Sequence, residues 1–259
     1  MFKRKTIIHR KLMFILILGI IILETSLNNY VVKAEEDQKT AIFLVPHQDD
    51  ELLTFGVAIL DHLWNNYDVH LVLMTDGGAS AANKVICDKL GFELTIEQFV
   101  EARNNEFIRS AQILGVDQDN IHFIEYKDGE ITTDDVKNTI LTFQEQYPNA
   151  SFKATSYLDK NSSHAAVGEG LQQMYDEGKV KDARFYMTFY QFGYEPIPET
   201  GYDNYHPHFQ PLIEASADVY NRWQPEFAWY AIGGHSVPML LEKVKENPIS
   251  RWHMPGFER

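Results

Sequence analysis

The feature that most restricts the possible folds of this chain is a regular alternation of short apolar runs with segments of helical periodicity. The runs favour β-strands and span residues 40–46, 69–74, 121–126, 152–158 and 183–190. Apolar residues recur three and four positions apart over residues 51–64, 96–114, 133–147 and 164–177. Runs that are apolar at successive positions indicate parallel strands buried on both faces. We therefore predict an α/β fold, with a Rossmann-like, doubly wound, mostly parallel sheet and helices on both faces.

This fold class also predicts where a ligand binds. In the common strand order 3-2-1-4-5, the first and fourth strands are neighbours at the point where the winding reverses. Ligands in such sheets bind beyond the carboxyl ends of the strands at that point. The loops after Pro46 and Leu158 follow these two strands, so we expect them to form the functional site.

Residues 1–34 have the pattern of a secretory signal peptide. Five basic residues precede a charge-free apolar run over residues 12–23, and Val32 and Ala34 stand three and one positions before the expected cleavage site. A membrane-spanning helix needs about 20 apolar residues, whereas this run has 12. We therefore expect cleavage after Ala34, no stable membrane insertion, and a secreted protein that is extracellular or associated with the cell wall.

Residues 35–259 contain no linker-like tract and no repeat, so we predict that they form one domain. Residues 1–34 hold six of the 23 Lys and Arg residues and one of the 37 Asp and Glu residues, which leaves 17 basic and 36 acidic residues and a net charge of −19. Such a surface repels nucleic acid and anionic polymers within a Debye length of about 8 Å. Cys87 is the only cysteine, which excludes an intramolecular disulfide and a zinc site built from several cysteines.

The loop after Pro46 carries candidate metal ligands. His47 leaves the strand end and Asp50 lies three residues on, where the helix begins, so an imidazole nitrogen and a carboxylate oxygen can converge on one cation. Zinc binds both at about 2.0–2.2 Å, and catalytic zinc sites keep a fourth position open for water. Asp49, between the two, is expected to point away from the ligands but to stay close enough to meet that water.

A helix cap is the alternative interpretation of this loop. Acidic residues at a helix start satisfy free amides and interact favourably with the helix dipole, and a lone histidine before a helix is usually a surface residue. His164, however, follows the fourth strand and therefore lies opposite the first loop in the expected strand order. The two loops together supply a His47/Asp50/His164 set with an open position, which predicts a zinc site.

The first loop resembles the Pro-His-Pro-Asp-Asp-Glu signature of the PIG-L/LmbE-like zinc-dependent N-acetylglucosamine deacetylase family. Further landmarks of that family follow in order over residues 40–170. They are Thr75-Asp76-Gly77-Gly78, Arg103-Asn104-Asn105-Glu106 ahead of Leu114-Gly115-Val116, Tyr126-Lys127-Asp128-Gly129, and His164-Ala165-Ala166-Val167-Gly168.

The resemblance implies a zinc-dependent hydrolase that removes an N-acyl group, which we expect to be acetyl, from an amino sugar such as N-acetylglucosamine in a glycan or glycoconjugate. It implies Asp49 as the general base, and substrate contacts from Arg103 and Asp128. The zinc ligands that it implies are His47, Asp50 and His164.

The sequence departs from the family pattern at two positions. Gln48 replaces a proline, a change that should be tolerated because its side chain has no role in the chemistry. Asn161 stands where the family often has a histidine that stabilises the oxyanion, and the loss of a charged donor lowers the rate by about 10²–10³ if nothing replaces it. Histidines of the C-terminal part that can substitute are His206, His208, His235 and His253. We favour His235, in the sequence Gly-Gly-His-Ser.

Two other classes of function compete with the enzyme. A sugar-binding protein would keep the metal pocket but, lacking the second histidine, have little catalysis, and the aromatic residues between 189 and 209 can either stack on a sugar or pack a loop onto the core. A nucleotide-binding Rossmann domain is disfavoured because no Gly-x-Gly-x-x-Gly motif follows the first strand.

Overall fold

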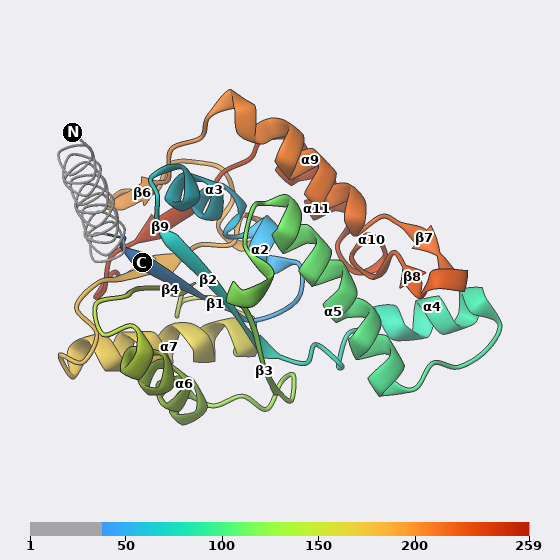
Figure 1. The fold of residues 1–259 in the computed structure, drawn as a ribbon, viewed down its shortest axis with the longest axis horizontal. Helices are drawn as coiled ribbons and strands as arrows, with labels where there is room; N and C mark the ends of the chain where they lie inside the picture. Colours follow the sequence, from blue (N-terminus) through green and yellow to red (C-terminus); the bar gives the residue numbers. More distant parts are fainter. Residues whose placement is uncertain (1–37, 259) are drawn as a thin grey trace, which may run out of the picture. The chain divides into compact units, whose positions relative to one another are not determined.

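The central element of the fold is a seven-stranded sheet, seen here in a computed structural model that describes residues 38–258. The expected signal peptide at residues 1–34 lies outside the described residues. The sheet has the strand order β3-β2-β1-β4-β5-β9-β6 (Figure 1). Its strands are β1 (Thr40–Val45), β2 (Asp68–Thr75), β3 (Ile121–Tyr126), β4 (Ser151–Thr155), β5 (Ala183–Tyr186), β6 (Thr200–Tyr202) and β9 (Arg251–His253).

The first five strands pair in parallel, so the predicted order 3-2-1-4-5 and the predicted fold class are confirmed. β1 and β4 are neighbours, with Ile42 opposite Phe152. The sheet then continues with two strands that the sequence analysis did not predict, because β9 pairs antiparallel with both β5 and β6. Within residues 38–258, no helix has both the length and the apolar character needed to span a membrane.

Alternate residues of β1 enter two separate cores, as the period of two along a strand requires. Ala41, Phe43 and Val45 pack in one cluster, and Ile42 and Leu44 pack in the other. Figure 1 shows α5 and α9 on one side of the sheet and α6 and α7 on the other. The helices of the first side are α3 (Gly56–Trp64), α5 (Ile96–Ile113), α9 (Gln210–Val219) and α11 (Pro238–Glu246), and those of the second are α6 (Thr133–Gln146) and α7 (Ser162–Asp176).

Several boundaries differ from the prediction. The helix expected over residues 51–64 is divided at Thr54 and Phe55 into α2 (Asp50–Leu53) and α3. The fifth strand, expected to reach residue 190, ends at Tyr186, and the chain turns into the short helix α8 (Phe189–Phe192). Elements that the periodicity did not reveal are α9, α11, α4 (Ala82–Leu90), α10 (Ile232–Ser236), the hairpin of β7 (Trp223–Gln224) and β8 (Trp229–Tyr230), and the 3-10 turns η1 (Gln118–Asn120), η2 (Pro207–Phe209) and η3 (Pro225–Phe227).

The close approach of α7 to the end of β4 depends on Gly168. A Cβ atom at this position would lie 2.4 Å from the backbone nitrogen of Tyr157 and 2.5 Å from the carbonyl oxygen of Thr155. These neighbours are backbone atoms and cannot rotate away. Because α7 also carries His164, the same contact sets the position of that side chain at the edge of the sheet.

We predict that Gly168→Ala lowers the free energy of unfolding by about 1–3 kcal/mol, the usual cost of overpacking a filled core. Urea denaturation followed by circular dichroism measures the change. Gly56→Ala is the matched control, because its Cβ would meet Leu52 Cδ1 at 3.4 Å, which is ordinary contact. Equal stability of the two variants would contradict the argument.

Candidate metal centre

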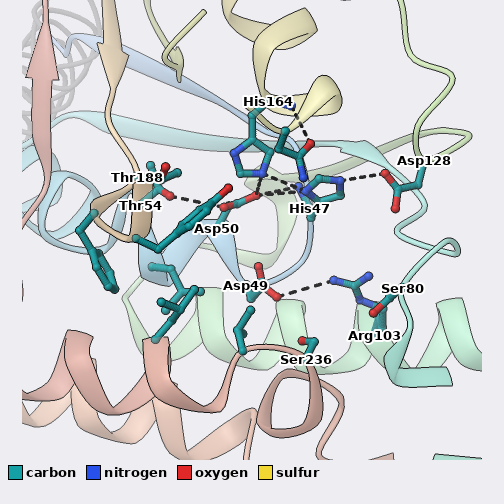
Figure 2. A pocket seen from close by; sticks show the side chains of 16 residues that line it. His47, Asp49, Asp50, Thr54, Ser80, Arg103, Asp128, His164, Thr188 and Ser236 are labelled. Carbon is teal, nitrogen blue, oxygen red and sulfur yellow. Dashed lines mark hydrogen bonds and ion pairs between the residues drawn. The ribbon is translucent and has the colours of Figure 1, made fainter. Parts of the chain in front are cut away.

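A cavity of about 400 Å³ opens beyond the carboxyl ends of β1 and β4. This is the place that the fold class predicts for a ligand. Figure 2 shows side chains from the loop after β1, from the start of α7 and from α5 that converge on it. The residues that line the cavity are His47, Asp49, Asp50, Leu53, Thr54, Ser80, Arg103, Asp128, Asn161, His164, Thr188, Phe189, Tyr190, Ser236, Val237 and Leu240.

The turn from β1 into α2 places His47 beside Asp50. The backbone N–H of His47 donates to Asp50 Oδ2 at 3.1 Å, and the same oxygen lies 3.5 Å from His47 Nδ1. Thr54 Oγ1 donates to the other oxygen, Asp50 Oδ1, at 3.4 Å. One oxygen of Asp50 is therefore directed at the histidine, and the other is held within α2.

His164 reaches the same point from α7. Asn161 caps this helix, since its Oδ1 accepts hydrogen bonds from the backbone N–H groups of Ser163 and His164. Thr155 Oγ1, at the end of β4, donates to the His164 carbonyl oxygen at 2.9 Å. His164 Nε2 then lies 3.0 Å from Asp50 Oδ2 and 3.1 Å from His47 Nδ1.

The three side chains fit a zinc ion. In a tetrahedral site with bonds of about 2.0–2.2 Å, neighbouring ligand atoms lie about 3.3–3.6 Å apart. Here His47 Nδ1, Asp50 Oδ2 and His164 Nε2 are separated by 3.0, 3.1 and 3.5 Å, so small shifts admit the ion. Two imidazoles and one carboxylate are also a donor set typical of catalytic zinc. The structure thus brings the three predicted ligands together.

Carboxylates hold the outer nitrogen of each histidine. Asp128 Oδ1 lies 2.9 Å from His47 Nε2 (Figure 2), which directs Nδ1 at the centre. Asp159 Oδ2 lies 3.4 Å from His164 Nδ1, at the distance of an ion pair rather than of a well-aligned hydrogen bond. Such partners orient metal-binding imidazoles. The sequence analysis missed Asp159, although it follows the carboxyl end of β4 just as Asp50 follows that of β1.

The centre concentrates negative charge that favours a cation. Burial alone would lower the pKa of His164, but Asp50 and Asp159 raise it to about 10. Burial likewise opposes the shift at His47, whose pKa is raised by its hydrogen bonds with Asp128 and Asp50. The charge of His164 in turn holds the pKa of Asp50 well below its usual range against the effect of burial. Without a metal ion, the carboxylates therefore favour protonated histidines. When a divalent ion binds, the histidines lose their protons and the ion supplies the positive charge instead.

Asp49 lies next to the three ligands in a strained backbone conformation. Its φ of 108° is in the left-handed region, which is unfavourable for a residue with a side chain. Burial and the charge of Asp50 raise the pKa of its carboxyl group to about 7. A carboxylate with a pKa near neutrality is suited to accept and return a proton.

Glu51 holds the backbone of Asp49 in this conformation. Its Oε2 accepts a hydrogen bond from the Asp49 backbone N–H at 3.0 Å. Its Oε1 accepts hydrogen bonds from Ser110 of α5 and from the hydroxyl of Tyr220, the latter at 2.6 Å. Glu51 is fully buried. The sequence motif contained this residue, but only the structure shows that it connects the loop to two distant helices.

Arg103 contacts the loop as well as the cavity. Its Nη1 donates to the carbonyl oxygen of Gly77 at 2.6 Å and its Nη2 to that of Gln48 at 2.9 Å. Nη2 also lies 3.7 Å from Asp49 Oδ2 (Figure 2). Arg103 and Asp128 both line the cavity, as the expected substrate contacts require, but Arg103 also contacts Asp49 and Asp128 also contacts His47.

The Gln48 side chain, for which we expected no role in the chemistry, holds the loop after β1 in place. This side chain is buried, and its Nε2 donates to the Asp76 carbonyl oxygen at 3.0 Å and to Asn104 Oδ1 at 2.7 Å. It therefore ties the loop after β1 to the loop after β2 and to α5. A proline makes neither bond, so this chain holds the loop by a different set of contacts.

His235, which we expected to replace the missing histidine, is not among the residues that line the cavity. Glu106 accepts hydrogen bonds from the backbone N–H groups of Ile232 and Gly233 and so sets the start of α10. On that helix Ser236 lines the cavity, whereas the His235 ring packs against Trp223 with ring centroids 5.8 Å apart.

The other histidines considered for this role also have partners elsewhere. His206 and His208 stack beside Trp64, and His253 lies 2.8 Å from the hydroxyl of Ser156. Asn161 does line the cavity, but its side-chain oxygen is engaged in capping α7.

Comparison with known protein families gives a match. The model of the family described as PIG-L, GlcNAc-PI de-N-acetylase, matches residues 42–175. No curated protein sequence matches the chain.

Solved structures share the fold at low sequence identity. A zinc-inhibited form of teicoplanin deacetylase superposes with a TM-score of 0.60 at 13% identity, over 83% of this chain and 97% of that chain. An N,N'-diacetylchitobiose deacetylase from Pyrococcus horikoshii has a TM-score of 0.55 at 16% identity, over 85% of each chain. A 4-carboxy-2-hydroxymuconate hydratase from Pseudomonas putida has a TM-score of 0.57 at 16% identity, over 86% of this chain and 98% of that chain.

We predict that Asp128→Ala weakens zinc binding by about 10–100-fold, the usual effect of removing the partner of a metal-binding histidine. Competition with a chromophoric chelator measures the affinity. Asp134→Ala, an exposed change on the same segment, should leave the affinity unchanged. An Asp128→Ala variant with the affinity of the control would show that Asp128 does not orient His47.

Proposed function

The chain belongs to the PIG-L, or GlcNAc-PI de-N-acetylase, family, and from this premise we propose that it is a secreted zinc-dependent hydrolase that removes the acetyl group from an amino sugar such as N-acetylglucosamine. Members of the family are metal-dependent N-deacetylases that act on sugar-related substrates. For this chain we propose four further points: that the metal is zinc, that the group removed is acetyl, that the substrate is an amino sugar such as N-acetylglucosamine, and that the protein is secreted.

The observation that carries the proposal is the position of Asp49 beside the His47/Asp50/His164 set. The fold by itself does not decide the reaction, because a hydratase shares it. Hydrolysis of an amide needs a polarised carbonyl group, an activated water molecule and a group that returns a proton to the nitrogen. A metal ion on the ligand set would polarise the carbonyl group and activate the water molecule, and Asp49 would return the proton to the nitrogen.

The residues of the cavity have separate roles in this scheme. A zinc ion held by His47, Asp50 and His164 would polarise the amide carbonyl and lower the pKa of a water molecule toward about 7. Asp49 accepts the proton of the attacking water and delivers it to the departing nitrogen. Arg103 keeps the Asp49 carboxylate on the cavity side through their 3.7 Å contact.

The lining of the cavity suits a neutral sugar. The lining includes the apolar side chains of Leu53, Phe189, Val237 and Leu240 and the carboxylates of Asp49 and Asp128. Apolar side chains pack against the C–H faces of a sugar ring, and carboxylates accept hydrogen bonds from its hydroxyl groups. Among the described aromatic residues between 189 and 209, Phe189 and Tyr190 line the cavity, so the remainder of that segment has no direct part in this binding mode.

Secretion places the substrate outside the cell. This part of the proposal rests on the basic and apolar pattern of residues 1–34. An exported enzyme of this family meets extracellular or cell-wall glycans and glycoconjugates, and the acidic surface disfavours anionic polymers among them. We therefore propose a neutral, N-acetylated glycan as the substrate.

Product analysis tests the function directly. The secreted protein, loaded with zinc, is incubated with a panel of N-acetylated amino sugars and their oligomers, and acetate and free amine are quantified. We expect equal amounts of the two products from at least one substrate, and loss of turnover after chelation. Zinc binding together with sugar binding, but without acetate release from any member, would contradict the enzyme and support the sugar-binding alternative.

Asp49→Asn is predicted to retain zinc and to lower kcat by about 10²–10⁴, the usual contribution of a general base. Asparagine tolerates the positive φ of this position and keeps the shape of the side chain, so the fold should persist. Zinc content by mass spectrometry and kcat on the best substrate are measured together. A variant with wild-type kcat would refute the role of Asp49.

A further inference from the structure

Hydrolysis at this centre requires a hydrogen-bond donor for the carbonyl oxygen, which becomes negatively charged as water adds to the carbon. The donors that line the cavity are mostly engaged. Arg103 donates to two backbone carbonyl oxygens. Thr54 donates to Asp50, and Thr188 donates to Asp159 at 2.8 Å. The side-chain oxygen of Asn161 caps α7, which leaves its amide N–H2 group as a neutral donor at the cavity.

Tyr190 is the phenol that lines the cavity on the side of Asp159. Its hydroxyl lies 3.4 Å from Asp159 Oδ1, while Asp159 Oδ2 lies 3.4 Å from His164 Nδ1. One buried carboxylate thus contacts both the metal-binding histidine and the Tyr190 hydroxyl. A bond of 3.4 Å is long for an O–H donor, so this hydroxyl can leave Asp159 for a better acceptor in the cavity.

The short helix α8 is fixed over the loop that carries Asp159. The backbone N–H of Lys160 donates to Gln191 Oε1 at 2.7 Å, and Gln191 Nε2 donates to the Leu158 carbonyl oxygen at 2.9 Å. These two bonds hold Gln191, and therefore its neighbour Tyr190, next to the start of α7. Tyr190 is thus held at the edge of the cavity that it lines.

The hydroxyl also remains protonated. Partial burial and the nearby carboxylates of Asp159 and Asp50 raise the pKa of Tyr190 well above its usual range. A phenol in this state is a permanent donor over the working range of pH, and it gives a hydrogen bond without giving up its proton.

We propose that Tyr190 is a catalytic residue of this chain, whose hydroxyl donates a hydrogen bond to the oxygen of the scissile amide as that oxygen becomes negatively charged. The role rests on the proposed deacetylation. As the water oxygen bonds to the carbonyl carbon, the C=O π electrons move to the oxygen and Asp49 takes the proton. When the C–N bond breaks, those electrons re-form the carbonyl group and the nitrogen receives the proton from Asp49. Tyr190 returns unchanged.

Tyr190→Phe tests this role because it removes the hydroxyl and keeps the ring. We expect kcat to fall by about 10²-fold, as for other donors to such an oxygen, with KM and zinc content close to the wild-type values. Tyr194→Phe is the matched control in the same segment. The Tyr194 ring stacks on Phe189 with centroids 5.1 Å apart, and its hydroxyl has no hydrogen-bond partner among the described residues.

A second measurement does not depend on turnover. The methylphosphonamidate analogue of N-acetylglucosamine, which mimics the tetrahedral intermediate, should bind to Tyr190→Phe about 10–100-fold more weakly than to the wild type. N-acetylglucosamine itself should bind equally to both proteins. Wild-type kcat and analogue affinity in Tyr190→Phe would overturn the role of Tyr190 while leaving the deacetylase intact. A wild type that releases no acetate from any substrate would instead contradict the proposed function and the role together.

Discussion

The parallel pairing of β1 with β4 is the contact on which the rest of the site depends. It brings the two loops that follow these strands to the same edge of the sheet, although His47 and His164 are 117 residues apart in the chain. Both strands are buried on both faces, so a shift of their register would disrupt two cores at once. The ligand geometry therefore depends on the hydrophobic core of the whole domain as well as on the local hydrogen bonds.

The centre gathers several buried carboxyl groups, and each has a partner that accounts for its position. Asp50 faces two histidines, Asp128 and Asp159 hold their outer nitrogens, and Glu51 holds the strained backbone of Asp49. Burial raises the pKa of Glu51 to about 8, against the hydrogen bonds that its carboxyl group accepts from Ser110 and Tyr220. Strain at Asp49 and unfavourable burial at this edge are tolerated because packing elsewhere stabilises the fold.

Much of the fold and the ligand set could be predicted from the sequence, because both follow from local patterns. Apolar runs mark the strands, and the rule for winding then places His47, Asp50 and His164 together. Residues that act through long-range contacts could not be found in this way. Asp159 and Glu51 accept hydrogen bonds from side chains that are distant in sequence. Gln48 donates hydrogen bonds to two separate segments. The position of His235 could not be predicted because the start of α10 depends on Glu106, a buried residue of another helix.

The central claim is that His47, Asp50 and His164 bind one catalytic zinc ion, and anomalous diffraction at the zinc edge tests it most directly. Crystals of the protein grown with zinc should show one strong peak at about 2.0–2.2 Å from His47 Nδ1, Asp50 Oδ2 and His164 Nε2. A further light atom in the open position would complete the coordination. Crystals that contain zinc, but with peaks only elsewhere on the molecule, would contradict the account.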